Sequence, residues 1–187
     1  MKEDGLLLVA LNLIPDLGSL KIQSLAERFK SFSDFMKAKP NDLLEIPGIG
    51  EKICEKIIAY KSKIEPHREI EKAEKQGIRI ITLFDEDYPE QLKQIYDPPP
   101  VLYIKGQRPV LDNNAIAIVG SRKASAYGRR VAINFAKELA SMNINIVSGM
   151  ARGIDSFAHK GAVDAGGPTT AVFGCGLDIV YPPENVA

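Results

Sequence analysis

The stretch AIVGSRKASAYGRR, from Ala117 to Arg130, joins an apolar run to a short loop and the first turn of an expected helix. The apolar run begins earlier, as AIAIVG over residues 115–120, and suits a parallel strand that is buried on both faces. After the loop, apolar residues recur at three- and four-residue intervals and predict a helix over about 127–142. A strand that leads through a glycine into a helix is typical of nucleotide-binding α/β folds.

The alternation of strands and helices continues toward the C-terminus. INIVS (144–148) and TTAVFG (169–174) are strand candidates, and a helix is expected between them over residues 154–165. This βαβ series predicts an α/β fold with a doubly wound, mostly parallel sheet. Three strands and two helices are few for a closed domain of this kind, so we expect the C-terminal portion of the sheet to be incomplete in this chain.

The N-terminal third has a different pattern. IPDLGSLKIQSLAERF, from Ile14, lines up with IPGIGEKICEKIIAYK, from Ile46, and each copy places an Ile-Pro-x-apolar-Gly turn before an amphipathic helix. Pro66 then marks a boundary. We therefore expect a small all-α domain over residues 1–66, built from tandem helix-hairpin-helix-like repeats, and an α/β domain over residues 67–187.

The second hairpin is a candidate DNA contact. Pro47-Gly48-Ile49-Gly50 exposes backbone N–H groups at the start of a helix, where the helix dipole also favours a phosphate oxygen. Lys52 and Lys56 lie on one face of that helix, and this pattern contacts the DNA backbone without reading bases. In the first hairpin Asp16 replaces Gly48, and because its carboxylate would repel phosphate we assign that copy to packing. Packing or protein contact remains an alternative for the second copy as well.

The composition fits an ordinary globular protein. Lys and Arg together number 24, as do Asp and Glu, so any affinity for nucleic acid must come from a local patch rather than from net charge. The sequence has no run of about 18 apolar residues, which argues against a membrane span. Two distant cysteines and two scattered histidines predict neither a metal site nor a disulfide, and we expect a cytoplasmic protein with reduced thiols.

The loop after the first parallel strand departs from a dinucleotide-binding loop, which needs Gly-x-Gly-x-x-Gly. Gly120 stands at the strand end but the next glycine is Gly128, so we expect no NAD, no FAD and no other cofactor. Instead, candidate phosphate- or base-binding side chains fill the loop: Ser121, Arg122, Ser125 and Tyr127. Hydroxyls and a planar guanidinium suit phosphate oxygens, whereas the tyrosine could stack on a base or merely pack. Further cations flank the loop, with no acid between residues 113 and 137: Lys123, Arg129 and Arg130.

The loop after the second strand is the expected partner of the first. Because the carboxyl ends of parallel strands meet at one edge of a sheet, SGMARGIDSFAH (148–159) should bring Arg152 to the crevice that holds Arg122. Glycines give the loops tight turns and an accessible backbone: Gly149 and Gly153 here, and Gly174 and Gly176 in the third loop. In the following helix we interpret Asp155 as a partner of the helix dipole and His159 as a core hydrogen-bonding group.

Three motifs in this order resemble the DprA/Smf family of DNA-processing proteins: Gly-Ser-Arg-x-x-Ser-x-Tyr-Gly (120–128), Ser-Gly-Met-Ala-Arg-Gly-Ile-Asp-x-x-Ala-His (148–159) and Gly-x-Gly-Leu-Asp-x-x-Tyr-Pro-x-x-Asn (174–185). Residues 81–106 also resemble the segment that precedes them in the family. The resemblance implies an extended Rossmann-like domain that binds single-stranded DNA and loads the RecA recombinase onto it during natural transformation. It also implies a homodimer and no catalytic activity.

Carried over by position, the resemblance implies that Arg122 and Arg152 contact DNA. Small residues would shape the pocket around them: Ser121, Gly149 and Gly153. The family continues past the position of Asn185 with more sheet and a dimerising surface. We therefore expect a C-terminally truncated member, which lacks part of what dimerisation, full DNA affinity and recombinase loading require.

Two other functions remain open. Nucleotide phosphoribohydrolases of the lysine-decarboxylase-like kind share a similar sheet, but they carry Gly-Gly-x-Gly-Thr and a glutamate beside the ribose. Here Pro168-Thr169-Thr170 follows the Gly-Gly pair, with no glutamate in register. The other alternative is an interaction module in which both domains serve only protein contact. Release of free base from nucleoside monophosphates would indicate the enzyme, and failure to bind oligothymidine would indicate the module.

Overall fold

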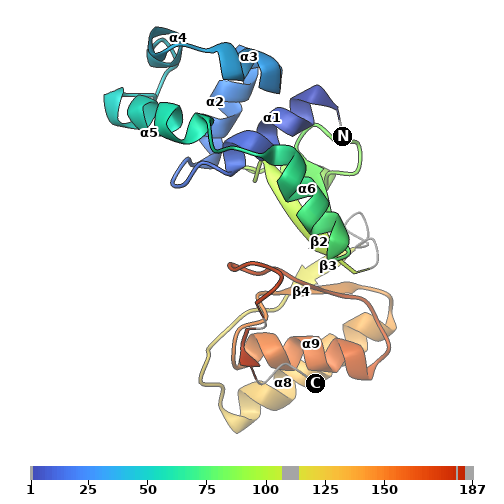
Figure 1. Ribbon diagram of the computed structural model, residues 1–187. Helices are drawn as coiled ribbons and strands as arrows, with labels where there is room; N and C mark the ends of the chain where they lie inside the picture. The colour runs from blue at the N-terminus through green and yellow to red at the C-terminus, as the bar shows by residue number, and fades with distance from the viewer. Residues whose placement is uncertain (1, 107–113, 180, 184–187) are drawn as a thin grey trace. The chain divides into compact units, whose positions relative to one another are not determined.

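The computed structural model describes residues 2–106, 114–179 and 181–183, which belong to two compact units, Met1–Gly106 and Gln107–Ala187 (Figure 1). The first unit is mainly helical and ends in a β-hairpin, whereas the second has parallel strands that alternate with helices. Within these described ranges, no helix combines the length and the apolar character that a membrane crossing requires.

The core of the first unit is centred on its first helix. Every residue of α1 from Gly5 to Leu11 is buried, as expected for a helix that is apolar on all sides. The helices that precede β1 (Ile78–Thr82) are α1 (Glu3–Asn12), α2 (Ser19–Phe29), α3 (Phe32–Lys37), α4 (Pro40–Leu44), α5 (Glu51–Lys61) and α6 (Pro66–Lys75). Their apolar faces form one core with α1, in which Leu25 of α2 and Ile57 of α5 are fully buried.

The predicted repeat is visible in the backbone of the two hairpins. Asp16 and Gly48 occupy the same turn position, with positive φ angles of 58° and 84°. Glycine adopts this conformation without steric cost, and aspartate is one of the few other residues that tolerate it. Gly18 and Gly50 are the N-caps of α2 and α5, and the carbonyl of each accepts the N–H groups three and four residues later. The two hairpins therefore share one geometry.

The β-hairpin of the first unit packs on its helices. Its elements are β1 (Ile78–Thr82), the short α7 (Glu90–Lys93) and β2 (Val101–Lys105), with β1 and β2 antiparallel. Val101 belongs to the helical core, and Ile80 and Tyr103 pack against that core. Because the hairpin completes the core around α1, the compact units divide at Gly106, whereas the sequence predicted a boundary after residue 66.

The second unit contains the predicted parallel sheet. Its elements are β3 (Ala115–Ala117), α8 (Ala126–Ser141), β4 (Asn145–Ser148), α9 (Ile154–Asp164) and β5 (Thr169–Ala171). The strands pair in the order β3-β4-β5, with Ile146 opposite Ile116 on one side and Thr169 on the other. Both crossovers advance in the same direction across the sheet, so right-handed connections place α8 and α9 on one face, side by side (Figure 1).

Burial in this sheet differs from the sequence prediction. The run AIAIVG was expected to be buried on both faces, yet the side chains of Ile116 and Val119 are 41% and 69% exposed. The prediction was wrong because β3 is an edge strand of the described sheet, and the helices cover mainly the central strand through alanines around Ile146. Of the two apolar residues directly after β3, only Ile118 packs against this cluster, whereas Val119 lies beyond the strand and is exposed.

We expect Leu8→Ala to lower the free energy of unfolding of the first unit by about 2–5 kcal/mol, because Leu8 is fully buried in α1. Leu20→Ala is the matched control, since Leu20 in α2 is 48% exposed. Urea denaturation followed by far-UV circular dichroism measures both variants. Equal loss of stability in the two would contradict a core centred on α1.

Candidate functional site

The loops that follow β3 and β4 meet at the carboxyl edge of the sheet. The N–H of Ile154 donates a hydrogen bond to the carbonyl of Ser121 at 3.2 Å. Gly153 has a φ of 86°, and a Cβ at this position would collide with the carbonyl oxygen of Ser121 and with the backbone of Arg122. Because glycine alone permits this approach, the two loops touch through their backbones. The structure thus brings the backbone of Arg122 next to Gly153, one residue from Arg152, while a shared crevice for the two guanidinium groups stays a prediction.

A buried carboxylate holds the same two loops together. Asp155, in the first turn of α9, is 6% exposed. Its Oδ1 accepts a hydrogen bond from the N–H of Gly120 at 3.3 Å, and its Oδ2 accepts one from the N–H of Gly149 at 3.2 Å. One side chain therefore binds the ends of two strands. The sequence indicates for Asp155 only an interaction with the helix dipole. It does not predict this bridge, whose one signal is an acid directly after a glycine-rich loop.

The two serine hydroxyls of the first loop have structural partners. Ser125 is the N-cap of α8, and its Oγ accepts a hydrogen bond from the N–H of Gly128 at 3.1 Å. The Oγ of Ser121 likewise accepts from the N–H of Lys123 at 3.1 Å. Each hydroxyl keeps its own hydrogen, which it can donate to a phosphate oxygen. The direct effect of both bonds is to fix the loop that carries Arg122.

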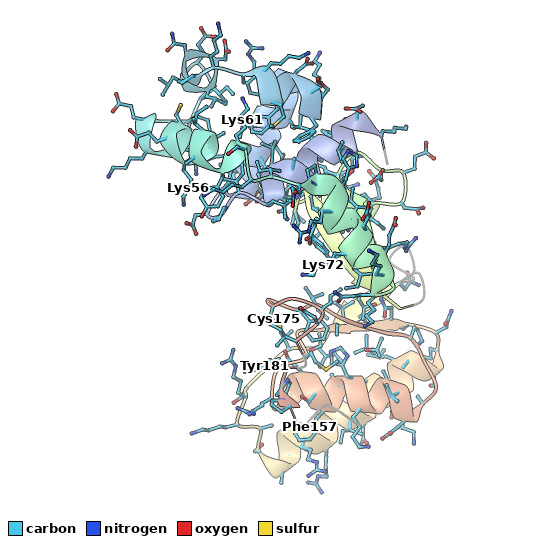
Figure 2. The ribbon with its side chains drawn as sticks, in the orientation of Figure 1. Lys56, Lys61, Lys72, Phe157, Cys175 and Tyr181 are labelled. Carbon is cyan, nitrogen blue, oxygen red and sulfur yellow. The ribbon has the colours of Figure 1, made fainter. Side chains whose placement is uncertain are left out.

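Cationic and aromatic side chains of these loops reach the solvent. The exposed cations are Arg122, Lys123 and Arg152. Tyr127, at the start of α8, is 70% exposed and so does not pack into the core. Gly174 and Gly176 flank the exposed Cys175 on the loop after β5 (Figure 2). Among the described residues, the backbone contacts between the loops after β3 and β4 do not include Gly174 or Gly176.

His159 lies in the core of the same unit, in the hydrogen-bonding role that the sequence predicted. Its Nδ1 is 2.7 Å from the hydroxyl oxygen of Thr169, and that hydroxyl donates to the carbonyl of Ile146 at 2.8 Å. Because the hydroxyl hydrogen is already used, the imidazole donates from Nδ1. Burial lowers the pKa of His159 below its ordinary value, so the ring is neutral at pH 7.

In the first unit an ion pair joins the two hairpins. The Nζ of Lys56 lies 2.6 Å from Oδ2 of Asp16, so the acid of the first hairpin holds a cation that we assigned to DNA contact in the second. The hydrogen bond from Lys56, and then its charge, keep the pKa of Asp16 below its ordinary value. Such exposed pairs add little stability. The carboxylate of Asp16 does balance the positive charge of Lys56. Lys52 then remains as an exposed lysine next to the hairpin of Gly48 and Gly50.

The model of the DNA recombination-mediator protein A family matches residues 79–187, more than half of the chain. The chain belongs to this family. A helix-hairpin-helix motif matches residues 6–69 as well, which confirms the interpretation of the helical repeats. The resemblance of the three loop motifs to the DprA/Smf family is thereby confirmed.

Two curated relatives in the family show how much of the chain is shared. Protein Smf of Synechocystis sp. is 35% identical over 176 residues, which cover 92% of this chain and 44% of that protein. DNA processing protein DprA of Bacillus subtilis is 42% identical over 112 residues, which cover 59% of this chain and 38% of that protein. The chain therefore spans less than half the length of these family members.

Solved structures of family members have the same fold. The X-ray structure of DprA from Streptococcus pneumoniae matches with a TM-score of 0.75 at 28% identity, covering 100% of this chain and 62% of that one. DprA from Helicobacter pylori, studied for its mode of binding single-stranded DNA, matches with a TM-score of 0.50 at 32% identity, covering 58% of this chain and 47% of that one. The α/β fold with a helical N-terminal region is that of the family.

Asp155→Asn replaces one accepting oxygen by an NH₂ group, which cannot accept the N–H of Gly120 or Gly149. We expect the free energy of unfolding of the second unit to fall by about 1–3 kcal/mol, because the buried NH₂ group would face a backbone donor in place of an acceptor. Asp164→Asn is the control, because Asp164 pairs with the exposed Lys160 at the surface of α9. Denaturant titration measures both, and an Asp155→Asn variant as stable as wild type would contradict the bridging role.

Protonation of His159 should destabilise the second unit at low pH. Its pKa is lowered in the folded state, whereas the unfolded chain keeps a value of about 6.5. The unfolded state therefore binds more protons as the pH falls through about 6.5, and stability is lost until the lowered folded pKa is reached. His159→Gln should reduce this loss, while His67→Gln should keep it, since His67 is exposed on α6. Urea titrations between about pH 5 and pH 8 measure the effect, and identical pH profiles for the two variants would refute it.

Proposed function

We propose that the joined loops after β3 and β4 bind the sugar-phosphate backbone of single-stranded DNA. The observation that carries this proposal is the backbone contact of Gly153 with Ser121 and Arg122, which sets Arg122 beside the loop of Arg152. Planar guanidinium groups on adjoining loops suit successive phosphates. The exposed ring of Tyr127 offers a surface for an unpaired base, and proteins follow single strands by combining such rings with a cationic groove. The H. pylori relative, which binds single-stranded DNA, supports the same choice.

In this proposal the loops bind their ligand without chemical change. Both oxygens of Asp155 accept loop N–H groups, and His159 is buried and neutral with Nδ1 bonded to Thr169. These two groups thus have structural partners at the strand ends, which supports a binding role over acid–base chemistry. Release of free base from nucleoside monophosphates would instead favour the phosphoribohydrolase.

For a protein that spans the whole length of its relatives we propose a wider role. It would act in the cytoplasm, load the RecA recombinase onto the bound strand during natural transformation, and work as a homodimer. Membership of a family of DNA recombination mediators supports this role. Since the chain spans 44% of the Synechocystis relative, recombinase contact and dimerisation are proposed for the full length and not for the described residues alone.

We expect Arg122→Ala and Arg152→Ala each to weaken binding of oligothymidine by about 1–3 kcal/mol and to lower the salt slope by about one. The reason is that each removes a phosphate contact and the counterion release that goes with it. Lys137→Ala, on the exposed side of α8, is the control for loss of charge alone. Lys52→Ala should have a smaller effect than either arginine change, because the hairpin contact is peripheral in this proposal.

Fluorescence anisotropy of a labelled strand, across a series of salt concentrations, measures these affinities. The assignment of the site is wrong if both arginine variants bind as wild type does. Absence of binding by the wild-type chain would support the interaction module instead.

A further inference from the structure

A hollow of about 620 Å³ lies beside the loop that carries Arg122. Its lining residues come from the loop before α8, from the first turn of α8 and from α9: Ala124, Ser125, Ala126, Arg129, Arg130 and Phe157. The sequence alone indicates only flanking positive charge for Arg129 and Arg130, and no role for Phe157. The hollow is distinct from the contact between Gly153 and Arg122, although the same two loops support it.

One wall of the hollow is a guanidinium group over an aromatic ring. The guanidinium carbon of Arg129 lies 5.0 Å from the centre of the Phe157 ring. Phe157, labelled in Figure 2, is partly buried, and its N–H donates to the carbonyl of Gly153 at 3.1 Å. The N–H of Arg129 donates to the carbonyl of Ser125 at 2.9 Å. Each member of the pair is therefore anchored to one of the two loops that carry the proposed DNA contacts.

The charge around the hollow is positive. Arg129 and Arg130 are exposed, and among the residues that the structure describes neither forms an ion pair. The sequence has no acid between residues 113 and 137. Asp155, in the first turn of α9, is buried and bound to loop amides. The hollow therefore suits a ligand that has a flat face for the Arg129–Phe157 pair and an anionic group for the cations.

We propose that the hollow seats one unpaired nucleotide of the bound strand, with its base against the Arg129–Phe157 pair and its phosphate near Arg130. This inference rests on the proposed function. Guanidinium planes and aromatic rings both stack on bases, whatever the base, and ligand sites of about 300–1,000 Å³ hold groups of this size. An acidic peptide would use the two cations but would leave the ring without a flat partner.

The test compares an oligothymidine with an abasic strand of the same length, which keeps the phosphates and lacks the bases. Arg129→Lys preserves the charge and removes the planar guanidinium. It should weaken binding of oligothymidine by about 5-fold or more and change binding of the abasic strand by less than about 2-fold. Phe157→Leu should have the same selective effect, because leucine keeps apolar bulk but cannot stack.

Arg28→Lys is the matched control, because Arg28 also lies over an aromatic ring, that of Phe29 at 5.5 Å, but belongs to α2 outside the proposed site, and it should change either affinity by less than about 2-fold. Arg122→Ala, in contrast, should weaken both strands alike. A second measurement uses the wild-type chain, so it does not depend on how the variants fold. Irradiation of its complex with a strand containing 5-iododeoxyuridine should crosslink the peptide that contains Phe157, as mass spectrometry would show.

The outcomes separate this inference from the function on which it rests. If the wild-type chain binds neither strand, the proposed function fails. The wild-type chain could bind oligothymidine while Arg129→Lys and Phe157→Leu have no effect or weaken binding of both strands equally. In that case the proposed function stands, and the nucleotide site in the hollow is wrong. Crosslinks confined to other peptides would also overturn it, as would polyglutamate that competes as well as oligothymidine does.

Discussion

The carboxylate of Asp155 is the interaction on which the candidate site depends. It accepts the N–H groups of Gly120 and Gly149 and so fixes the ends of two neighbouring strands to the first turn of α9. Burial of a carboxylate is costly, but two backbone donors and the positive end of the helix dipole offset that cost. Because this carboxylate is buried and accepts hydrogen bonds from the loops, it fixes the loops that carry the exposed arginines. It does not lie at the surface, where it would repel an anion.

The contact at Gly153 explains why these loops depart from a dinucleotide-binding loop. In a Gly-x-Gly-x-x-Gly loop, glycines let the backbone approach a pyrophosphate. Here Gly153 lets one loop approach the backbone of Ser121 and Arg122 instead, so the proposed function assigns contact with the ligand to side chains. In the proposed function, exposed guanidinium groups on adjoining loops pair with phosphate oxygens from the surface. They suit a chain in which phosphates recur and in which contact with the backbone positions the ligand without reading its sequence.

Local patterns in the sequence predicted local structure, because glycine turns, caps and periodicity act between near neighbours. The shared turn of Asp16 and Gly48 and the strand-loop-helix course around Gly120 follow from such patterns. The missed features join distant residues. Asp155 and Gly120 are 35 positions apart, and Lys56 and Asp16 are 40 apart. Periodicity says which face of an element is apolar but not which element it meets, so the packing of Val101 into the helical core and the unit boundary at Gly106 could not be predicted.

The acid nearest the candidate DNA contact lies at the surface in one unit and is buried in the other. In the helical unit the carboxylate of Asp16 is at the surface, so a phosphate that approaches Lys56 must compete with a carboxylate already bound there. In the α/β unit Asp155 is buried, and exposed arginines and a lysine lie on the loops above it. Since the chain as a whole has no net charge, attraction depends on these local arrangements. In the proposed function we therefore expect the α/β unit to attract a phosphate chain more strongly than the helix-hairpin-helix unit does, even though the latter carries the motif more often associated with DNA backbone contact.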